Sequence, residues 1–560
     1  MKAAEAVVNI LENEETKYVF GLPGTSLIPF LEGFESSDKI DFISSLNENI
    51  AMGIADGYSR ASWSPSFVFL HSAPGLSATL SNLYNAYIDN VPLVLVIGEA
   101  DTRLEIDEPS HWIDDLRGIV NHFTQWSWKV SNPEDIPKAL RRSIKIATST
   151  SGGPTCILIP ENLGPSEINY VSHSPETYHI NSKFNADAIQ ITKAAKMLMT
   201  SKSPVVIAGK EVAKADAISE LIELCECLSL PVLSESAVPF TQSINFPQDH
   251  HLYLGTFNPT LPIVQEADTI FAIGCRILPQ RKYLPKPPIP LTARIIHLHN
   301  EPWEIARSYP TDIGLLSDIS SGVKSIIAEV KTRLTKDIEL IAQARNKQIE
   351  SFLELSRIEN EKLLKEGFND APIKPWRLIK EMENVLGKDT IIVDDGITTS
   401  TYLSPFYRFT KPGTLVGRSP GSLGWGGPAA LGVKLASPNK KVVSLLGDGT
   451  FLFAIQSLWT SAKYNIPIVH IVCNNKVYAS IKTPWIGYRG TPNGDFSGTD
   501  LSKSIDIQKL SEGFGVNCAT VTQPSELSAV LRRALNSEEP EVVNVVLDPT
   551  ISGLGMRRLK

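Results

Sequence analysis

Short apolar runs alternate with longer helix-like segments along the whole chain. In the first third, the runs at 17–20, 41–44, 66–70 and 92–97 are rich in β-branched and aromatic residues, and the stretch 47–61 has a helical pattern. Continuous apolar runs separated by helical segments are typical of strands buried on both faces of a parallel sheet. This pattern predicts a doubly wound α/β domain over residues 1–165.

The same alternation continues through two further blocks. A second block has strand-like runs at 204–208, 230–233, 269–273 and 294–299, and a third has them at 442–446, 466–473 and 541–547. A charged, helical segment over 332–366 joins these two blocks. The predicted fold class is therefore α/β, with three consecutive doubly wound α/β domains and mainly parallel sheets, at 1–165, 186–335 and 366–560.

Composition narrows the classes of partner without changing this picture. Hydrophobic residues make up 42% and charged residues 20% of the chain, so sizeable cores are expected. The net charge of −8 gives no reason to expect a nucleic-acid partner, and the six cysteines do not form a disulfide framework. The apolar runs are too short to span a membrane, and acidic residues near the start do not fit a signal peptide. We expect a cytoplasmic protein with no nucleic-acid or membrane partner.

The stretch 447–475 carries the most specific chemistry. An apolar strand ends in Gly447-Asp448-Gly449, a helix-like segment follows, and the next apolar strand ends in Asn474-Asn475. Such a βαβ unit brings both strand ends to the same edge of a parallel sheet, so Asp448 and Asn475 can reach one cation. One carboxylate and one amide leave open positions for phosphate oxygens, as magnesium sites usually do. The glycines allow a diphosphate to approach the backbone, and the N-terminus of the crossover helix favours its charge.

This arrangement resembles the diphosphate-binding motif of thiamine diphosphate enzymes; a structural glycine turn with a capping Asn is the plain alternative. The resemblance covers nearly the whole chain and implies thiamine diphosphate and Mg²⁺ as cofactors and the thiamine diphosphate-binding fold. In the family, the segment matching 419–428 bends the cofactor with an apolar wedge and a backbone carbonyl. The implied cofactor-binding residues are Gly421, Leu423, Thr398, Gly447, Asp448, Gly449, Thr450, Asn475 and Tyr478, with Asp448, Asn475 and Val477 at the metal.

The resemblance also implies a second part of the site, which contains Glu48. It lies in DFISSLNENIAMGIADGYSRA (41–61), which is similar to the family segment carrying the carboxylate beside the cofactor's pyrimidine ring. In the family that carboxylate favours the imino form, whose nitrogen removes the thiazolium proton. A first-turn Glu that suits the helix dipole is the alternative explanation.

Within the family, the chain most resembles benzoylformate decarboxylase and the acetolactate synthase-like group. FGLPGTSLIPFL, IADGYSRAS, LHSAPG and LWTSAKYNIP carry this likeness. His71 matches an active-site His that relays protons in benzoylformate decarboxylase, and Thr25 occupies the position of a substrate-binding Ser. A His at a strand end can also be a structural hydrogen-bonder. The implied catalytic residues are thus Glu48, His71 and Thr25.

Several positions depart from benzoylformate decarboxylase. The stretch 275–282 lacks that enzyme's second His, and Arg281 falls near its position. Ser110 and His111 stand near two apolar pocket positions, and Gly417, next to Arg418, replaces a bulky aromatic residue. These changes favour a polar or anionic 2-oxo acid paired with an arginine. The substrate residues we predict are His111, Arg281, Arg418 and Ile481.

The resulting prediction is a thiamine diphosphate- and Mg²⁺-dependent, non-oxidative 2-oxo acid decarboxylase, with carboligase activity as a further capacity. The alternative is an acetolactate synthase-like carboligase: Gly274-Cys275-Arg276 resembles the start of a motif in that group, although the group lacks a His at position 71. An FAD-dependent oxidase is less expected. An inactive scaffold or regulatory subunit is also less expected, because Glu48, Asp448 and Asn475 are all present. The family implies a homodimer or homotetramer with active sites at subunit interfaces.

Overall fold

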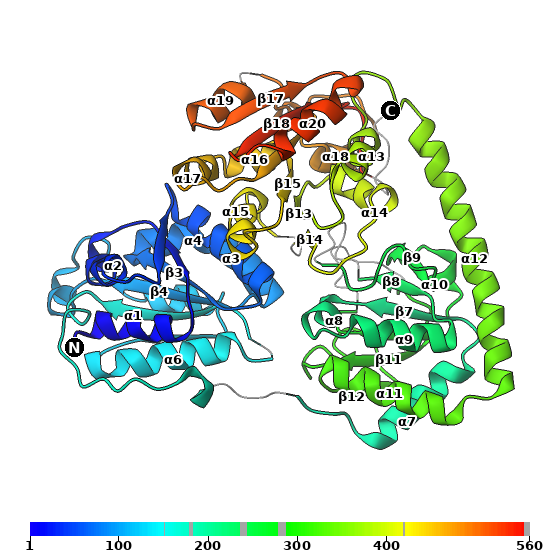
Figure 1. Ribbon diagram of the computed structural model, residues 1–560, viewed down its shortest axis with the longest axis horizontal. Coiled ribbons are helices and arrows are strands. Elements are labelled where there is room, and N and C mark those ends of the chain that lie inside the picture. The colour runs from blue at the N-terminus through cyan, green and yellow to red at the C-terminus, as the bar shows by residue number, and fades with distance from the viewer. Residues whose placement is uncertain are drawn as a thin grey trace.

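The computed structural model describes residues 1–150, 152–178, 183–235, 243–277, 287–417, 421–503 and 505–553. Figure 1 shows three lobes in chain order, an N-terminal lobe in blue, a central lobe in green and a C-terminal lobe in yellow to red. Each lobe is built on a six-stranded sheet whose neighbouring strands run parallel. The predicted fold of three consecutive α/β domains with parallel sheets is confirmed.

The N-terminal sheet has the strand order β2-β1-β3-β4-β6-β5. Four of its strands coincide with predicted apolar runs, and the inner strands at 66–71 and 93–99 are buried along nearly their whole length. The strands are β1 (Tyr18–Gly21), β2 (Asp41–Ser44), β3 (Ser66–His71), β4 (Leu93–Glu99), β5 (Trp126–Lys129) and β6 (Thr155–Pro160), and the helices are α1 (Ala3–Asn13), α2 (Ile28–Glu35), α3 (Glu48–Ser62), α4 (Ser72–Asp89), α5 (Leu116–Asn121) and α6 (Ile136–Ala147).

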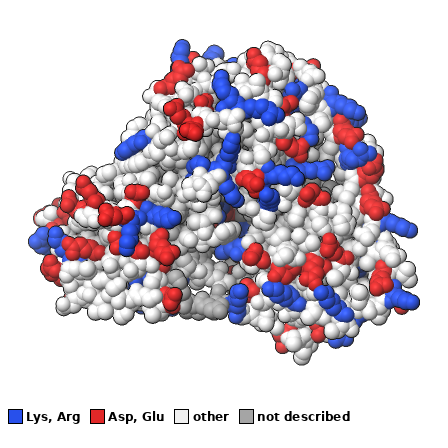
Figure 2. Space-filling model, viewed as in Figure 1, with Lys and Arg blue, Asp and Glu red and all other residues white. Residues whose placement is uncertain are grey.

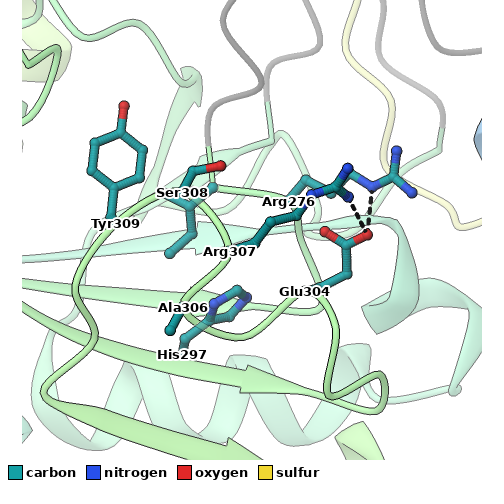
Figure 3. Close-up of a pocket in the computed structure, with 8 residues that line it drawn as sticks. Arg276, His297, Glu304, Ala306, Arg307, Ser308 and Tyr309 are labelled. Carbon is teal, nitrogen blue, oxygen red and sulfur yellow. Dashed lines mark hydrogen bonds and ion pairs between the residues drawn. The ribbon is translucent and has the colours of Figure 1, made fainter.

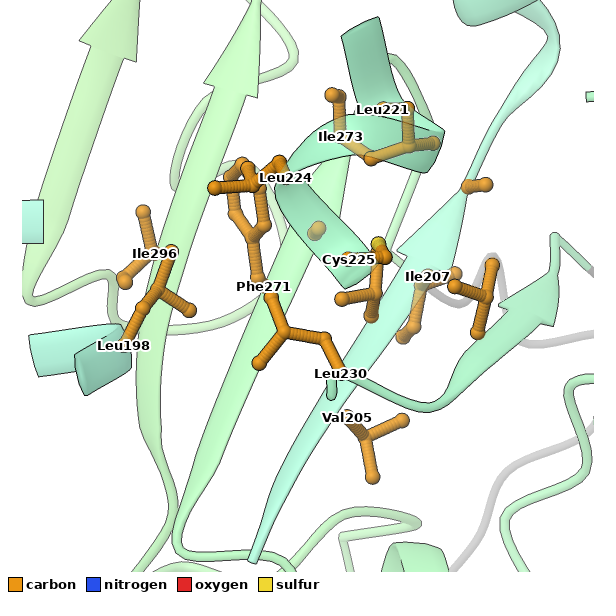
Figure 4. Packing of buried hydrophobic residues seen from close by; sticks show 14 of the residues in the cluster. Leu198, Val205, Ile207, Leu221, Leu224, Cys225, Leu230, Phe271, Ile273 and Ile296 are labelled. Carbon is orange, nitrogen blue, oxygen red and sulfur yellow. The ribbon is translucent and has the colours of Figure 1, made fainter. Parts of the chain in front are cut away.

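The central sheet has a different order, β12-β11-β10-β7-β8-β9. Figure 4 shows its core, where strand residues such as Ile207, Phe271 and Ile296 pack against helix residues such as Leu198 and Leu224. The strands are β7 (Pro204–Ala208), β8 (Val232–Ser234), β9 (Tyr253–Thr256), β10 (Thr269–Ile273), β11 (Arg294–His299) and β12 (Ile313–Leu316), and the helices are α7 (Ala188–Thr200), α8 (Lys210–Lys214), α9 (Ile218–Leu228), α10 (Pro262–Gln265) and α11 (Ile319–Arg333).

The C-terminal sheet repeats the order of the N-terminal one, as β14-β13-β15-β16-β18-β17. The long helix α12 (Lys336–Lys365) runs along the outer edge of the molecule from the central lobe to this one (Figure 1). The strands are β13 (Ile391–Asp395), β14 (Leu415–Val416), β15 (Val442–Gly447), β16 (Val469–Asn474), β17 (Asn517–Val521) and β18 (Glu541–Val546), and the helices are α13 (Pro375–Val385), α14 (Leu403–Phe406), α15 (Gly426–Ala436), α16 (Asp448–Phe453), α17 (Ser457–Lys463), α18 (Ala479–Arg489), α19 (Ile507–Gly513) and α20 (Leu527–Leu535).

The shared strand order places a topological switch point in each outer domain. In the N-terminal sheet the order reverses between β1 and β3, and in the C-terminal sheet it reverses between β13 and β15. The crevice beside the carboxyl ends of such strands is where open α/β sheets bind ligands. We therefore expect functional residues after β1 and β3 in one domain and after β13 and β15 in the other.

The two outer domains are joined by a close helix pair, α3 and α15. A Cβ on Gly432 would lie 1.9 Å from the carbonyl oxygen of Ile54, and a Cβ on Gly57 would lie 2.1 Å from that of Ala429. Glycine alone permits this approach of two backbones. Apolar residues from both domains then form one buried cluster around Trp425.

The crossover after β15 differs from the single helix that the sequence predicts. It consists of two short helices, α16 and α17, because Ala454 leaves the helical region with φ −134°. Ala is a good helix former, so the hydrophobic pattern alone does not locate this break.

On the face seen in Figure 2, acidic and basic side chains are interspersed with uncharged ones. Within the described ranges, every helix is too short or too polar to cross a membrane.

Candidate active site

Most of the predicted cofactor residues meet in one pocket at the C-terminal switch point. The carboxyl ends of β13, β15 and β16 supply its walls, so residues far apart in sequence become neighbours. Its described lining comes from the C-terminal domain alone. It brings together the predicted residues Thr398, Leu423, Gly447, Asp448, Gly449, Thr450, Asn475, Val477 and Tyr478.

Asp448 provides the test of whether this pocket suits a cation. Its side chain is 6% exposed, and its two carboxylate oxygens accept backbone N–H groups from Gly449 at 2.8 Å and Lys476 at 2.7 Å. Within the described part of the chain, no Lys or Arg forms an ion pair with it. Burial raises its pKa to about 6 because the charged form loses its water. A bound divalent cation would offset that cost, so the residues fit a metal.

The loop carrying Leu423 is fixed from two sides. Asp395, at the end of β13, accepts hydrogen bonds from the backbone N–H groups of Trp425 at 3.2 Å and Gly426 at 2.9 Å. Asn85 of α4 accepts from the backbone N–H of Ser422 at 2.8 Å and donates to its carbonyl at 3.2 Å. Gly421 lies next to this contact but does not line the pocket among the described residues. The bonds hold Leu423 at the pocket wall.

The predicted catalytic residues gather at the other switch point, in the N-terminal domain. Glu48 is the first residue of α3, and its carboxylate lies against Gly75 in the first turn of α4. His71 ends β3, and a Cβ on Gly24 would lie 2.4 Å from the His71 Cβ, so only glycine fits there. Thr25 follows that glycine with an exposed side chain. The three residues thus share one edge of the sheet.

His71 is the centre of a hydrogen-bonded chain. Its Nδ1 lies 2.7 Å from the Ser26 hydroxyl, which donates to the Gly98 carbonyl at 3.0 Å. Its Nε2 lies 3.2 Å from Nδ1 of His111. Burial lowers the pKa of His71, and the neighbouring His111 lowers it further. Both effects favour the neutral imidazole, which is the form that can accept a proton.

Comparison with known proteins agrees with this geometry. Family models of the thiamine pyrophosphate enzymes match in three parts: the N-terminal TPP binding domain over residues 1–119, the central domain over 191–326 and the C-terminal TPP binding domain over 396–545. A probable acetolactate synthase large subunit of Methanocaldococcus jannaschii is 30% identical, with 98% of this chain and 92% of that protein aligned. The chain belongs to the thiamine pyrophosphate enzyme family.

A curated decarboxylase and a solved decarboxylase structure are also similar to this chain. Benzoylformate decarboxylase of Pseudomonas aeruginosa is 26% identical, with 96% of this chain and 98% of that protein aligned. The solved thiamine diphosphate-dependent 4-hydroxybenzoylformate decarboxylase of Rhodococcus jostii RHA1 superposes with a TM-score of 0.84 at 23% identity, covering 98% of this chain and 99% of that one. At that identity the superposition shows the shared fold alone.

A buried ion network links this family's two cofactor-binding domains to the central one. The Arg60 guanidinium pairs with Asp56 and, at 2.9 Å, with Asp89, and it donates to the Gly417 carbonyl at 3.0 Å. Lys210 of the central domain donates to the backbone carbonyl of Asp89 at 2.8 Å. The network thus reaches from the central domain to the strand that precedes the Leu423 loop.

Some predicted substrate residues of this thiamine pyrophosphate enzyme are not placed at the site. Arg281 and Arg418 lie outside the described residues. Ile481 is on α18, where its side chain is 57% exposed. Arg276, just before the segment with Arg281, lines a separate cavity of the central domain with His297 and forms an ion pair with Glu304 at 2.9 Å (Figure 3). That ion pair engages the Arg276 guanidinium in a cavity whose described lining contains none of the predicted site residues.

Sequence reasoning missed three residues that shape this thiamine pyrophosphate site. Ser26, the residue after the predicted Thr25, contacts His71. Asp395 holds the Leu423 loop, and Arg60 supports the strand before it. The available signals were Asp395 at the end of an apolar strand and Arg60 one helical turn after Asp56. The sequence of the loop around Thr25 gave no signal that the neighbouring Ser26 would contact His71.

Proposed function

We propose that this thiamine pyrophosphate enzyme catalyses the non-oxidative decarboxylation of a 2-oxo acid with thiamine diphosphate and Mg²⁺. When bound, the cofactor supplies the nucleophilic carbon and the electron sink for departure of the carboxylate. The observation that carries the proposal is His71, which lies at a ligand-binding switch point with a lowered pKa and a hydrogen bond on each ring nitrogen. Such a group suits proton transfer near neutral pH.

The diphosphate end is assigned to the C-terminal pocket. Asp448, Asn475 and the Val477 carbonyl would hold Mg²⁺, which would neutralise part of the charge of the diphosphate. The Val477 carbonyl accepts the N–H of Ala479 at 2.8 Å, and its second lone pair is available to a metal. Leu423, which lines the pocket, would be the apolar residue that packs against the cofactor.

Glu48 is assigned to the pyrimidine end of the cofactor. It is half-buried in the N-terminal domain, whereas the described lining of the diphosphate pocket belongs to the C-terminal domain. A single cofactor reaches both when the domains belong to different subunits, which supports a homodimer or homotetramer with interface sites. Closing that interface removes water from Glu48 and strengthens its hydrogen bond.

Decarboxylation replaces a carboxylate by a proton, so the site needs a proton donor as well as a cofactor. His71 is assigned that role, and Thr25 is assigned the position of the family's substrate-binding Ser. Arg281 or Arg418 remains the predicted partner for a second acidic group on the substrate. Neutral and acidic 2-oxo acids of matched size, assayed for CO₂ release with thiamine diphosphate and Mg²⁺, test this proposal. Turnover of benzoylformate without turnover of any acidic analogue would contradict the substrate part.

An acetolactate synthase-like carboligase is the second candidate, favoured by the 30% identity to the Methanocaldococcus jannaschii relative. Both reactions release CO₂, and they differ in whether a proton or a second carbonyl compound takes the reacting carbon. Product analysis with a 2-oxo acid alone separates them. Aldehyde as the main product supports the decarboxylase, and a 2-hydroxy-2-alkyl-3-oxo acid supports the carboligase.

A further inference from the structure

We propose that Tyr464 of the C-terminal domain is a positioning residue for Glu48. This inference rests on the proposed function, in which Glu48 acts at the pyrimidine end of the cofactor. Tyr464 is the C-cap residue of α17, which lies beside the N-terminal lobe (Figure 1). Its hydroxyl reaches the end of β2, the strand that leads to Glu48, where it accepts the backbone N–H of Ser44 at 2.9 Å and donates to the Phe42 carbonyl at 3.4 Å.

The two backbone groups that Tyr464 binds lie on the outer edge of the N-terminal sheet. β2 is the outermost strand of that sheet and pairs with β1. The Ser45 N–H points toward β1 and donates to the Gly21 carbonyl at 3.1 Å. Because the N–H and C=O groups of successive strand residues point to opposite sides, those of Phe42 and Ser44 face away from β1. A phenol hydroxyl both accepts and donates, so this one side chain pairs with an edge group of each kind.

The chain between Ser44 and Glu48 is hydrogen-bonded internally, so the position of the strand end determines the position of the carboxylate. The hydroxyl of buried Ser45 donates to the Asn47 carbonyl at 2.8 Å. The Asn47 side chain caps α3 by accepting the N–H of Asn49 at 2.7 Å. A shift of Ser44 is therefore transmitted through this loop to the first turn of α3, which carries Glu48.

The other side of Glu48 is held within the N-terminal domain by α4. Buried Asn82 donates its side-chain N–H to the Asn49 carbonyl at 2.8 Å and its backbone N–H to the Asn49 side-chain oxygen at 3.1 Å. Tyr464 supplies the contact on the opposite side, before the loop, and it comes from the C-terminal domain. Glu48 is thus located by hydrogen bonds from both outer domains.

The Tyr464 ring has contacts of its own that do not depend on the hydroxyl. It packs against the apolar cluster that the two outer domains share, and the Lys463 ammonium lies 5.1 Å from the ring centroid. Tyr464→Phe keeps the ring and removes only the two hydroxyl bonds to β2. We therefore expect this variant to fold as wild type does, with a loosened end of β2.

Amide hydrogen exchange without substrate or cofactor tests the contact itself. The control is Tyr170→Phe, which removes another half-buried hydroxyl of this chain, one that donates to Asn9 at 3.2 Å. In Tyr464→Phe we expect exchange over residues 44–49 to become about tenfold faster or more, because local opening there becomes easier. Tyr170→Phe should leave it unchanged. Unchanged exchange over 44–49 in Tyr464→Phe, or faster exchange at Ser44 alone, overturns the proposal.

A double-mutant cycle on CO₂ release tests whether Tyr464 acts through Glu48. We expect Tyr464→Phe to lower kcat about tenfold and to leave KM within about threefold, because a displaced carboxylate impairs the reaction more than substrate binding. In a Glu48→Ala background the same substitution should lower the residual rate less than about twofold, since no carboxylate is left to position.

Equal losses in the two backgrounds, or no loss in either, would overturn the positioning role, and Tyr170→Phe should keep wild-type activity. A wild type that releases no CO₂ refutes the proposed function instead. The exchange measurement then still decides whether Tyr464 fixes the loop that carries Glu48.

Discussion

Glu48 is the residue on which the proposed chemistry depends most directly. It is a half-buried carboxylate at the start of α3, so Glu48→Gln keeps the shape and removes the charge. We expect CO₂ release to fall about 100-fold or more because the cofactor ring loses the carboxylate that favours its imino form. Glu35→Gln, at an exposed position of α2, is the control. Calorimetry should give cofactor affinities within about threefold of wild type in both variants; full activity in Glu48→Gln would refute the mechanism.

Asp448 makes a prediction about pH and magnesium. Its pKa is raised from 3.8 to about 6 by burial, so between these values the metal-free folded protein holds a proton that the unfolded chain releases. The free energy of unfolding of the metal-free protein therefore falls as pH rises across that window. Magnesium needs the ionised carboxylate, so its stabilising effect grows as pH rises through about 6.

Thermal unfolding with and without Mg²⁺ and thiamine diphosphate at pH 5 and pH 7.5 tests this. We expect the larger increase in melting temperature at pH 7.5 in wild type. In Asp448→Asn the increase should be small at both pH values, since the anionic ligand is gone. An Mg²⁺-dependent increase that is equal at both pH values in wild type would contradict the assignment.

At the scale of elements, we expect opposite effects from a glycine substitution in the α3–α15 contact and one in an open position of α18. In Gly432→Ala the new Cβ meets backbone atoms of α3, the Ile54 oxygen at 1.9 Å and the Tyr58 nitrogen at 2.5 Å, which no rotamer change relieves. We expect the free energy of unfolding to fall by about 1–3 kcal/mol. Gly487 lies within α18 with nothing within 4 Å of its Cβ position, so Gly487→Ala should gain up to about 1 kcal/mol. Denaturant unfolding curves measure both, and a neutral Gly432→Ala would show that the helices are further apart.

Elements were predictable where burial alone determines them. The strands at 204–208, 269–273 and 294–299 coincide with β7, β10 and β11, because strands buried on both faces are continuous apolar runs. No apolar pattern in the sequence marks the break between α16 and α17. The same holds for the strand order that the two outer domains share. Asp448 and Asn475 were found because a fixed spacing links two strand ends, whereas Ser26 depends on the path of one loop.

At the scale of the whole molecule, the two groups of site residues lie at equivalent positions of the two outer domains. The His71 and Glu48 group lies at the switch point of one domain, and the Asp448 pocket lies at the same switch point of the other. The α3–α15 contact and the Arg60–Asp89–Lys210 network fix these domains relative to each other within a chain. On the proposed interface site, a second copy related by a two-fold axis would pair each group with its complement.

Mixed assemblies test this directly. Glu48→Gln and Asp448→Asn chains should each be inactive alone, since every site then carries one defect. In a mixed dimer, one site receives both substitutions and the other receives neither. Random association makes half of the dimers mixed with one intact site of two, so co-expression should restore about a quarter of wild-type CO₂ release. A single chain carrying both substitutions, co-expressed with itself, is the control and should stay inactive. If the site formed within one chain, each chain would retain its own defect and the mixture would show no recovery.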